Sequence, residues 1–323
     1  MKEAVVFGGV QALPGEKRQG YAPILGSGHT MPITVINGRK EGKTVLITSG
    51  VHGGEYPCIQ TALELAAELD PGKVSGQIVL VHPVCVSSFM TRTSYYTPED
   101  GKNINRAFPG DATGTLAEQI AYVLTHEFQD RADLYFDLHG GDLQESLPVQ
   151  VYYPYFPEVP DASVAETCRS MADLVAARFK VKAPIASTAA VSAAVRGVPS
   201  LMIELGGRGL WSREDVDAYK RIMTNLLRYA GCIPGNPVLP ETPAEELFGA
   251  FTPNSPADGA WYPTVGLGDE VARGQKVGEV RDLLGQTIQE IYSEVDGKVV
   301  YLIVSLAVRA SEPLLSIGLS QKN

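Results

Sequence analysis

Two short motifs place histidine and glutamate side chains where they could bind one metal ion. His52 and Glu55 lie three residues apart in the segment GVHGGE (residues 50–55), and His139 ends the segment DLYFDLH (residues 133–139). Catalytic zinc in hydrolases typically takes three protein ligands, often His and Glu, and leaves a fourth position for water. The spacing alone leaves two interpretations open: one metal site, or a chance H-x-x-E pair together with a hydrogen-bonded structural histidine.

Both motifs follow apolar segments that have the composition of buried strands. Residues 44–49 (TVLITS) run into the first motif, while Asp137 and His139 are two residues apart and so point to one face of their strand. Asp137 could then hydrogen-bond a ligand histidine and fix its tautomer. Pro57 and the spacing of the apolar residues after it predict a helix directly after the first motif.

Strands and helices alternate over roughly the first 230 residues. Further strands are expected at residues 77–82, 150–153 and 200–204. Three further helices begin at sequences that resemble capping boxes: Thr115 with Glu118, Ser163 with Glu166, and Ser212 with Asp215. This alternation predicts an α/β fold whose mainly parallel or mixed sheet is covered by helices on both faces. In such a fold, site residues gather at the carboxyl ends of the strands.

The composition and periodicity of the sequence change near residue 235. Prolines recur through residues 234–256, and from Gly259 onward short apolar segments alternate with glycine turns and show no good helical period. We therefore predict a catalytic domain over residues 1–240 and a small all-β domain over residues 241–323.

The composition argues against several classes of protein. The 323 residues carry a formal net charge of -10 and have a pI of about 5.1, whereas nucleic acids and anionic membranes require a basic surface. No apolar segment approaches the ~18 residues that cross a bilayer, and the N-terminus lacks the apolar core of a signal peptide. The scattered cysteines are expected to be buried, reduced thiols: Cys58, Cys85, Cys168 and Cys232. These features predict a cytoplasmic protein with no nucleic-acid or membrane partner.

The motifs GVHGGE, NINR (residues 103–106) and DLH together resemble the succinylglutamate desuccinylase/aspartoacylase family, which is similar to the zinc carboxypeptidases. The resemblance covers the whole chain. It implies a zinc-carboxypeptidase-like α/β fold followed by a small biotinyl/lipoyl-like β domain that partly covers the active site. It also implies one zinc ion per chain, with His52, Glu55 and His139 as its ligands.

The same resemblance implies roles for residues that act on the substrate. Asn105 and Arg106 match a pair that grips a free carboxylate of the substrate, and a guanidinium fork suits that contact. Arg92 resembles the arginine that polarises the scissile carbonyl and stabilises the oxyanion. Glu204, at the end of an apolar strand, matches the catalytic glutamate, and burial there would raise its pKa toward that of a useful general base. The structural alternative for Glu204 is a salt bridge with Arg208.

One position departs from the family pattern. The family often carries Asp two residues before the Asn of the Asn-Arg pair, whereas this chain has Asn103. We expect this change to loosen the positioning of Arg106 without removing its contact. Asp142 and Glu145 are less favoured than Glu204 as catalytic acids, because they are expected to lie in a polar loop.

Together these residues predict a zinc-dependent hydrolase that cleaves the amide bond of a small N-acyl amino acid or N-acyl amine carrying a carboxylate. The alternative within the same chemistry is a zinc carboxypeptidase acting on short peptides. A less favoured hypothesis is a metal- or ligand-binding protein without catalysis. A carrier role for the β domain is not expected, because Asp282 and Leu283 stand where the hairpin would need a lysine. The acyl group, the amine, the metal used in the cell and the oligomeric state, a homo-oligomer included, are left open.

Overall fold

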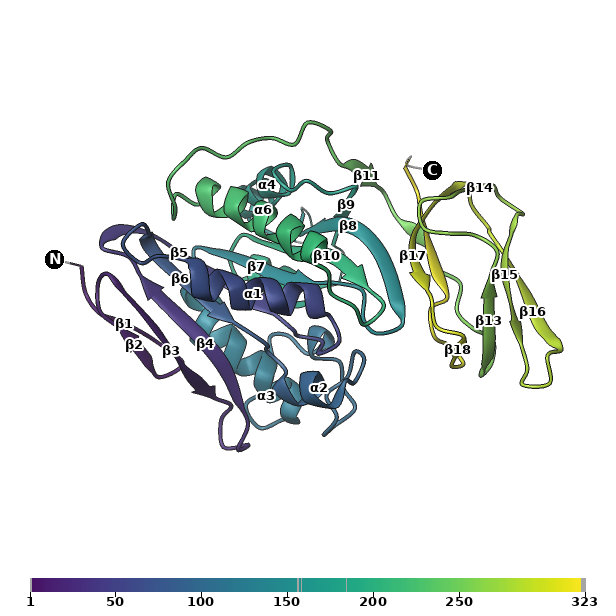
Figure 1. The fold of residues 1–323 in the computed structure, drawn as a ribbon, viewed down its shortest axis with the longest axis horizontal. Coiled ribbons are helices and arrows are strands. Elements are labelled where there is room, and N and C mark those ends of the chain that lie inside the picture. Colours follow the sequence, from purple (N-terminus) through teal and green to yellow (C-terminus); the bar gives the residue numbers. More distant parts are fainter. Residues whose placement is uncertain (1, 156, 158, 184, 321–323) are drawn as a thin grey trace.

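A large mixed sheet forms the centre of the protein and has helices packed on both faces (Figure 1). The computed structural model describes residues 2–320 apart from residues 156, 158 and 184. The main path of the sheet runs in the order β12 (Ala250–Phe251), β19 (Leu315–Gly318), β17 (Gly297–Ile303), β8 (Glu145–Tyr153), β10 (Ser200–Gly207), β7 (Leu134–His139), β5 (Lys40–Ser49), β6 (Ser75–Val81), β4 (Thr30–Asn37) and β3 (Glu16–Pro23). Beside this path lie β9 (Phe179–Lys182), β11 (Glu245–Leu247) and β14 (Glu270–Val271).

The centre of the sheet is parallel. Strands β6, β5, β7 and β10 are parallel neighbours, while β4 and β8 flank them in the antiparallel direction. The carboxyl ends of β5, β7 and β10 therefore meet at one edge of the sheet. This edge is where the two sequence motifs and Glu204 were expected to lie, and the α/β prediction is confirmed.

Two apolar cores cover the two faces of the sheet. One core packs α1 (Tyr56–Glu68), α4 (Ala162–Ala172) and α6 (Arg213–Tyr229) on the sheet, and the other includes α3 (Leu116–Val123) and residues of α5 (Ala189–Val195). Side chains of β7 alternate between them, since Leu134, Phe136 and Leu138 join the first core and Tyr135 joins the second. By the same alternation, Asp137 and His139 project on the side of Tyr135.

Shorter elements complete this part of the chain: β1 (Val5–Phe7), β2 (Val10–Ala12), α2 (Val86–Thr91), the 3-10 turns η1 (Ile104–Arg106) and η3 (Gln129–Arg131), and the π-type turn η2 (Leu124–Phe128). Two of the predicted caps are confirmed, because Thr115 forms a capping box with Glu118 and Ser212 caps α6. The prediction for Ser163 is wrong. Asp161 caps α4, with its side chain accepting a hydrogen bond from the backbone N–H of Ser163.

The described residues beyond 240 form strands and no helix. A second sheet contains β16 (Thr287–Tyr292), β15 (Lys276–Arg281), β13 (Gly259–Pro263) and β18 (Ala307–Val308). It encloses its own apolar core with the C-terminal strands, at one end of the molecule in Figure 1. These strands are also joined to the main sheet, because β17 pairs with the start of β8 through Leu302 with Ser146 and Ile303 with Glu145. The boundary at residue 240 stays a prediction.

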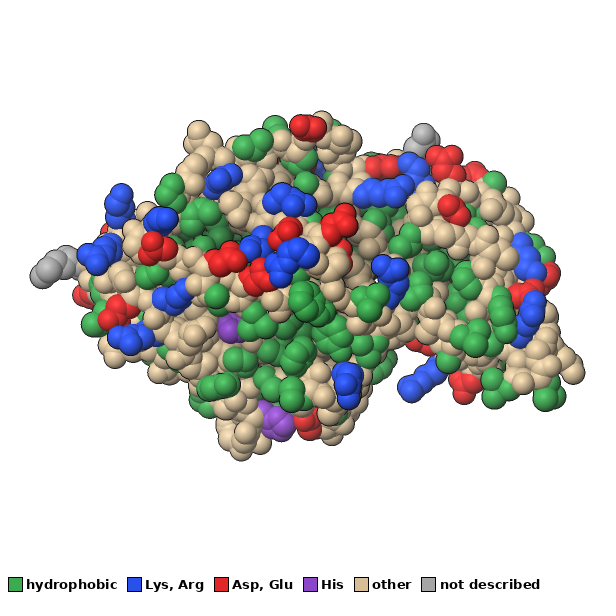
Figure 2. Space-filling view, in the orientation of Figure 1, with side chains coloured by type: hydrophobic (Ala, Val, Ile, Leu, Met, Phe, Trp, Pro, Cys, Tyr) green, Lys and Arg blue, Asp and Glu red, His purple; other side chains and the backbone are tan. Residues whose placement is uncertain are grey.

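Charged side chains of both signs are intermixed on the face shown in Figure 2. Over α1 and α6, for example, Arg213 and Lys220 pair with Glu64 at 2.8 and 3.1 Å. Among the helices of the described residues, none has the length and apolarity needed to cross a membrane.

Candidate metal centre

The loop after β5 is shaped so tightly that glycine is required in it. A Cβ atom added to Gly53 would lie 2.1 Å from the backbone nitrogen of Phe89, and one added to Gly54 would lie 1.9 Å from Asp142 Oδ1. The backbone can therefore approach Phe89 and Asp142 this closely only because these two positions carry no side chain. This close passage fixes where His52 and Glu55 leave the backbone.

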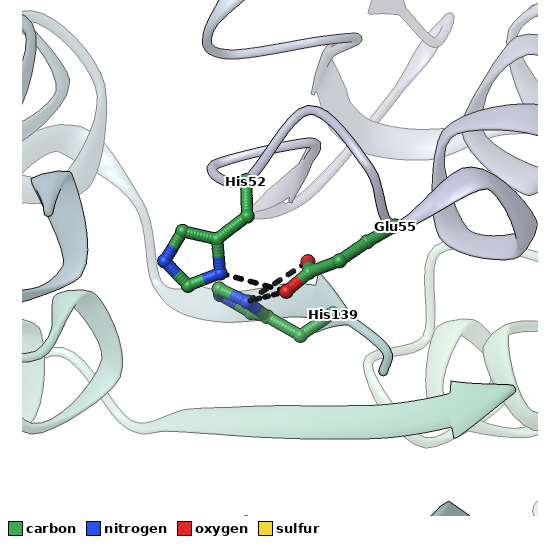
Figure 3. Close-up of side chains that lie close together, drawn as sticks. All are labelled: His52, Glu55 and His139. Atoms are coloured by element: carbon green, nitrogen blue, oxygen red, sulfur yellow. Dashed lines mark hydrogen bonds and ion pairs between the residues drawn. The ribbon is translucent and has the colours of Figure 1, made fainter. Parts of the chain in front are cut away.

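His52, Glu55 and His139 converge in the interior of the protein (Figure 3). The Nδ1 atom of His52 lies 2.7 Å from Glu55 Oε1, and the Nδ1 atom of His139 lies 3.1 Å from Glu55 Oε2. One ligand atom from each residue lies within 4.8 Å of the others, and all three side chains are buried. The structure thus brings together the three residues that were predicted to bind a metal ion.

The Nε2 atoms of both histidines, which face away from Glu55, each lie within hydrogen-bonding distance of a side-chain oxygen. His139 Nε2 lies 2.8 Å from Asp137 Oδ2, and His52 Nε2 lies 3.0 Å from Asn103 Oδ1. Because these oxygens accept hydrogen bonds, each ring carries its hydrogen on Nε2 and, when neutral, turns the lone pair of Nδ1 toward Glu55. Two nitrogen lone pairs and a carboxylate then face one another, an arrangement that would stabilise a cation between them.

Two further observations fit a cation at this point. Glu55 Oε2 is buried and has no hydrogen bond within the described part of the chain. Burial disfavours charge on His139, yet Asp137 and Glu55 outweigh it and raise its pKa well above the usual value. The cluster therefore favours added positive charge, and a His-Glu-His set with lone pairs directed inward suits a divalent metal such as zinc.

Glu204 lies beside this cluster and has no hydrogen-bonding or ion-pair partner in the part of the chain that the structure describes. It is paired in register with His139 across β10 and β7. No hydrogen bond or ion pair of the Glu204 side chain occurs among the described residues, so the alternative of a salt bridge with Arg208 is not formed. Burial raises the pKa of Glu204 to about 8, with Glu55 and Glu145 adding to the rise and His139 opposing it. An unpaired carboxylate of this kind can accept a proton near neutral pH.

The Asn-Arg pair lies on the short turn η1. The oxygen of Asn105 accepts a hydrogen bond of 2.8 Å from the backbone N–H of Ala189, which anchors the turn to α5. Arg106 is partly exposed. Partial burial of its guanidinium lowers its pKa, and the negative charge of the nearby Glu204 opposes that effect. Arg106 makes no ion pair with any described residue, and its Nη1 donates a 2.7 Å hydrogen bond to the carbonyl of Asn105. A guanidinium left without a carboxylate near Glu204 is available to one from a ligand.

Asn103 lies at the start of the turn that carries Arg106, and the expected loosening of Arg106 stays a prediction. Its side chain accepts a 2.8 Å hydrogen bond from the backbone N–H of Asn105 and so caps the turn that carries Arg106. The same oxygen contacts His52. Asn103 therefore contacts a ring of the histidine cluster as well as the Asn-Arg turn.

Arg92 is not drawn into the cluster. It is exposed at the end of α2, with a left-handed backbone at φ 55°, and its side chain makes no hydrogen bond or ion pair with the described residues. Its role in polarising a carbonyl stays a prediction.

A second polar cluster adjoins His52 and was missed from the sequence. The Tyr95 ring lies edge-on to His52, with the ring centres 6.1 Å apart. The hydroxyls of Tyr95 and Tyr301 both donate to Glu145 Oε1, and Glu145 Oε2 accepts a 2.9 Å hydrogen bond from the backbone N–H of Asp142. Asp142 and Glu145, which had been assigned to a polar loop, are buried. Tyr301 on β17 brings the C-terminal strands into this cluster.

The model of the succinylglutamate desuccinylase/aspartoacylase catalytic domain matches residues 41–230 of the chain. This match spans every residue of the histidine cluster, Glu204 and the Asn-Arg pair. The chain belongs to the succinylglutamate desuccinylase/aspartoacylase family.

The chain is also similar to individual named proteins and solved structures. The chain is 30% identical over 274 residues to the N-alpha-acetyl-L-2,4-diaminobutyric acid deacetylase of Halomonas elongata, covering 83% of this chain and 79% of that protein. The product-bound structure of the ectoine utilization protein EutE (DoeB) from Ruegeria pomeroyi is similar, with a TM-score of 0.84, 25% identity and coverage of 95% and 97% of the two chains. A succinylglutamate desuccinylase/aspartoacylase from Rhodobacter sphaeroides gives a TM-score of 0.82 and 26% identity over 95% and 96%.

Proposed function

We propose that the protein is a zinc-dependent deacylase that hydrolyses the amide bond of a small N-acyl amino acid. The observation that carries this proposal is the pair of inward-facing Nδ1 atoms beside Glu55, with the unpaired carboxylate of Glu204 next to them. A zinc ion held by His52, Glu55 and His139 would supply a Lewis acid for the scissile carbonyl and for the attacking water.

The chain's own residues would perform the remaining steps. Glu204 would take the proton of the attacking water and deliver it to the leaving amine. Asn105 and Arg106 would hold a carboxylate of the substrate, supported by the absence of any ion pair of Arg106 with the described residues. Arg92 would stabilise the oxyanion, which would require its exposed side chain to turn toward the substrate.

The relatives suggest where the substrate search should begin. The named activity of the Halomonas elongata relative is removal of an acetyl group from an N-acetylated diamino acid. We infer that an N-acetyl amino acid with a short side chain is the first class to test. We also propose that residues 241–323 form a β domain that restricts access to the site, because Tyr301 shares Glu145 with Tyr95, whose ring lies against His52.

A metal analysis combined with a substrate panel tests the proposal. Purified protein should contain about one zinc ion per chain and release free amine from N-acetyl or N-succinyl amino acids more readily than from dipeptides. A chelator should abolish turnover and lower the melting temperature, because a ligand that binds only the folded state stabilises it, and added zinc should restore both. Stoichiometric zinc without hydrolysis anywhere in the panel would contradict a deacylase, and preferential release of C-terminal residues from peptides would favour a carboxypeptidase.

A further inference from the structure

We propose that Asn103 is a positioning residue of the metal centre: it fixes the tautomer of His52 and, because it is neutral, keeps metal binding weaker than a carboxylate would. This inference rests on the proposed metal site. It concerns the side chain that lies behind one of the proposed ligands, His52.

The hydrogen-bond pattern determines which atom of Asn103 faces His52. Oxygen and nitrogen of an amide are assigned from their partners, and here the atom in question accepts a 2.8 Å hydrogen bond from the backbone N–H of Asn105. A backbone N–H can only donate, so this atom is the oxygen. The same oxygen lies 3.0 Å from His52 Nε2. His52 must therefore donate from Nε2, which leaves the Nδ1 lone pair facing Glu55.

The two histidines are supported by unlike groups. His139 Nε2 donates to the carboxylate of Asp137, whose other oxygen accepts a 2.6 Å hydrogen bond from the hydroxyl of Thr48. His52 Nε2 instead donates to the neutral amide oxygen of Asn103. A carboxylate behind an imidazole makes the ring a stronger electron donor to the metal. His52 is accordingly the weaker donor of the two.

The charges of the buried cluster give a physical reason for a neutral residue here. Glu55 and Asp137 are both buried and together balance the charge of a divalent ion. Glu204 stands close by, as the register partner of His139, and is a further acidic group beside the site. A further carboxylate at position 103 would add negative charge to a buried site and draw electron density onto the metal. With Asn103, the ion is held less tightly and keeps more of its electrophilic character.

The decisive variant is Asn103→Asp, because it retains both acceptor roles of the side chain and changes its charge. We expect it to tighten zinc binding roughly tenfold or more, since partners behind ligands change metal affinity by roughly 10- to 100-fold. The zinc dissociation constant is measured by competition with a chromophoric chelator, using the full chain at one pH and without substrate. Asn236→Asp, at an exposed position without a hydrogen bond to the described residues, is the matched control and should leave the constant unchanged.

Two further variants keep the inference testable if Asn103→Asp folds poorly. Asp137→Asn should weaken zinc binding by roughly 10- to 100-fold, and the double variant Asn103→Asp/Asp137→Asn should return it toward the wild-type value. Asn103→Ala removes the acceptor and should weaken binding. Nitrogen NMR of the zinc-loaded wild type should show the Nε2–H tautomer for His52, a signature that a merely structural role would not require.

The outcomes separate this inference from the proposed function. Unchanged or weaker zinc binding by folded Asn103→Asp, unchanged binding by Asn103→Ala, or an Nδ1–H tautomer of His52 would each overturn the inference, even in an active deacylase. If the charge changes act as expected but no N-acyl compound is hydrolysed, the inference stands and the deacylase proposal fails. A wild-type protein that binds no zinc would refute both.

Discussion

Glu204 and His139 are register partners in the adjacent parallel strands β10 and β7. Because side chains alternate along each strand, paired residues of parallel neighbours project on the same face. A candidate proton acceptor and a candidate metal ligand are thus held side by side by backbone hydrogen bonding. Tyr219 of α6 reinforces this arrangement, since its hydroxyl donates to the carbonyls of both His139 and Ile203.

Replacing Glu204 with Gln should remove catalysis while leaving the metal centre intact. The amide cannot accept the proton, and loss of a general base typically costs about 10²- to 10⁴-fold in turnover. Steady-state kinetics and zinc content are the measurements. Glu241→Gln, at an exposed position that has no ion pair within the described residues, serves as the control. Retained turnover in the Glu204 variant, or loss of its zinc, would refute the role given to Glu204.

Replacing Arg106 should weaken substrate binding more than it slows the chemical step. A hydrogen bond to a charged group contributes about 2 kcal/mol, so Arg106→Ala should raise KM by roughly thirtyfold. Arg106→Lys keeps the positive charge but loses the two-pronged guanidinium contact, so its KM should lie between those of the wild type and Arg106→Ala. The control is Arg221→Ala on the exposed surface of α6. A KM unchanged in Arg106→Ala would mean that the substrate carboxylate binds elsewhere.

Local sequence patterns placed the members of the histidine cluster at the ends of two strands, but their spacing alone left open whether they form one site. His52 and Glu55 share one loop, and Asp137 and His139 share one strand face. The alternation of strands and helices predicts a mainly parallel sheet with strand ends on one edge, but the structure is needed to show that β5 and β7 are neighbours in it. The resemblance of the motifs to a known family was therefore needed to predict that the three residues share one metal ion.

Contacts between distant segments could not be predicted in this way. The contact of Asn103 with His52 depends on how the loop after α2 folds back over the first motif. The contact of Tyr301 with Glu145 requires β17 to pair with the start of β8, and sequence patterns predict the strands but not their partners. The cap at Asp161 was missed because Ser163 is an equally good capping type and only the backbone path distinguishes them.

The ion pairs of Glu64 should make the link between α1 and α6 sensitive to acid. Hydrogen bonds from Arg213, and then from Gln60 and Lys220, lower the pKa of Glu64 to about 2 from an ordinary 4.5. Because the folded pKa is the lower one, its stabilisation is present above pH 4.5 and is lost as the pH falls toward 2. Glu64→Gln should cost about 1 kcal/mol or less near pH 7, as expected for a surface pair.

Melting of the zinc-free protein between pH 7 and pH 2 measures this effect, and Glu241→Gln is again the control. The difference between wild type and Glu64→Gln should shrink as the pH drops through the window from 4.5 to 2. A difference that is constant with pH would contradict the electrostatic origin.

Replacing Tyr301 with Phe should show that the C-terminal strands support the site. The Phe ring fills the same space, but Glu145 loses one of its two hydroxyl donors inside the protein. Leaving a buried acceptor underpaired costs about 1–3 kcal/mol, so the melting temperature should fall. Because Tyr95 shares Glu145 and packs against His52, KM should rise as well, with zinc content unchanged.

Tyr292→Phe is the matched control for this change. Tyr292 also donates its hydroxyl to a glutamate, Glu290, but it does so on the exposed strand β16. The control should therefore leave both melting and KM close to wild type. If the two variants behave alike, the hydroxyl of Tyr301 has no special part in the site. If Tyr301→Phe lowers the melting temperature but leaves KM unchanged, the C-terminal strands stabilise the fold without positioning Tyr95 against His52.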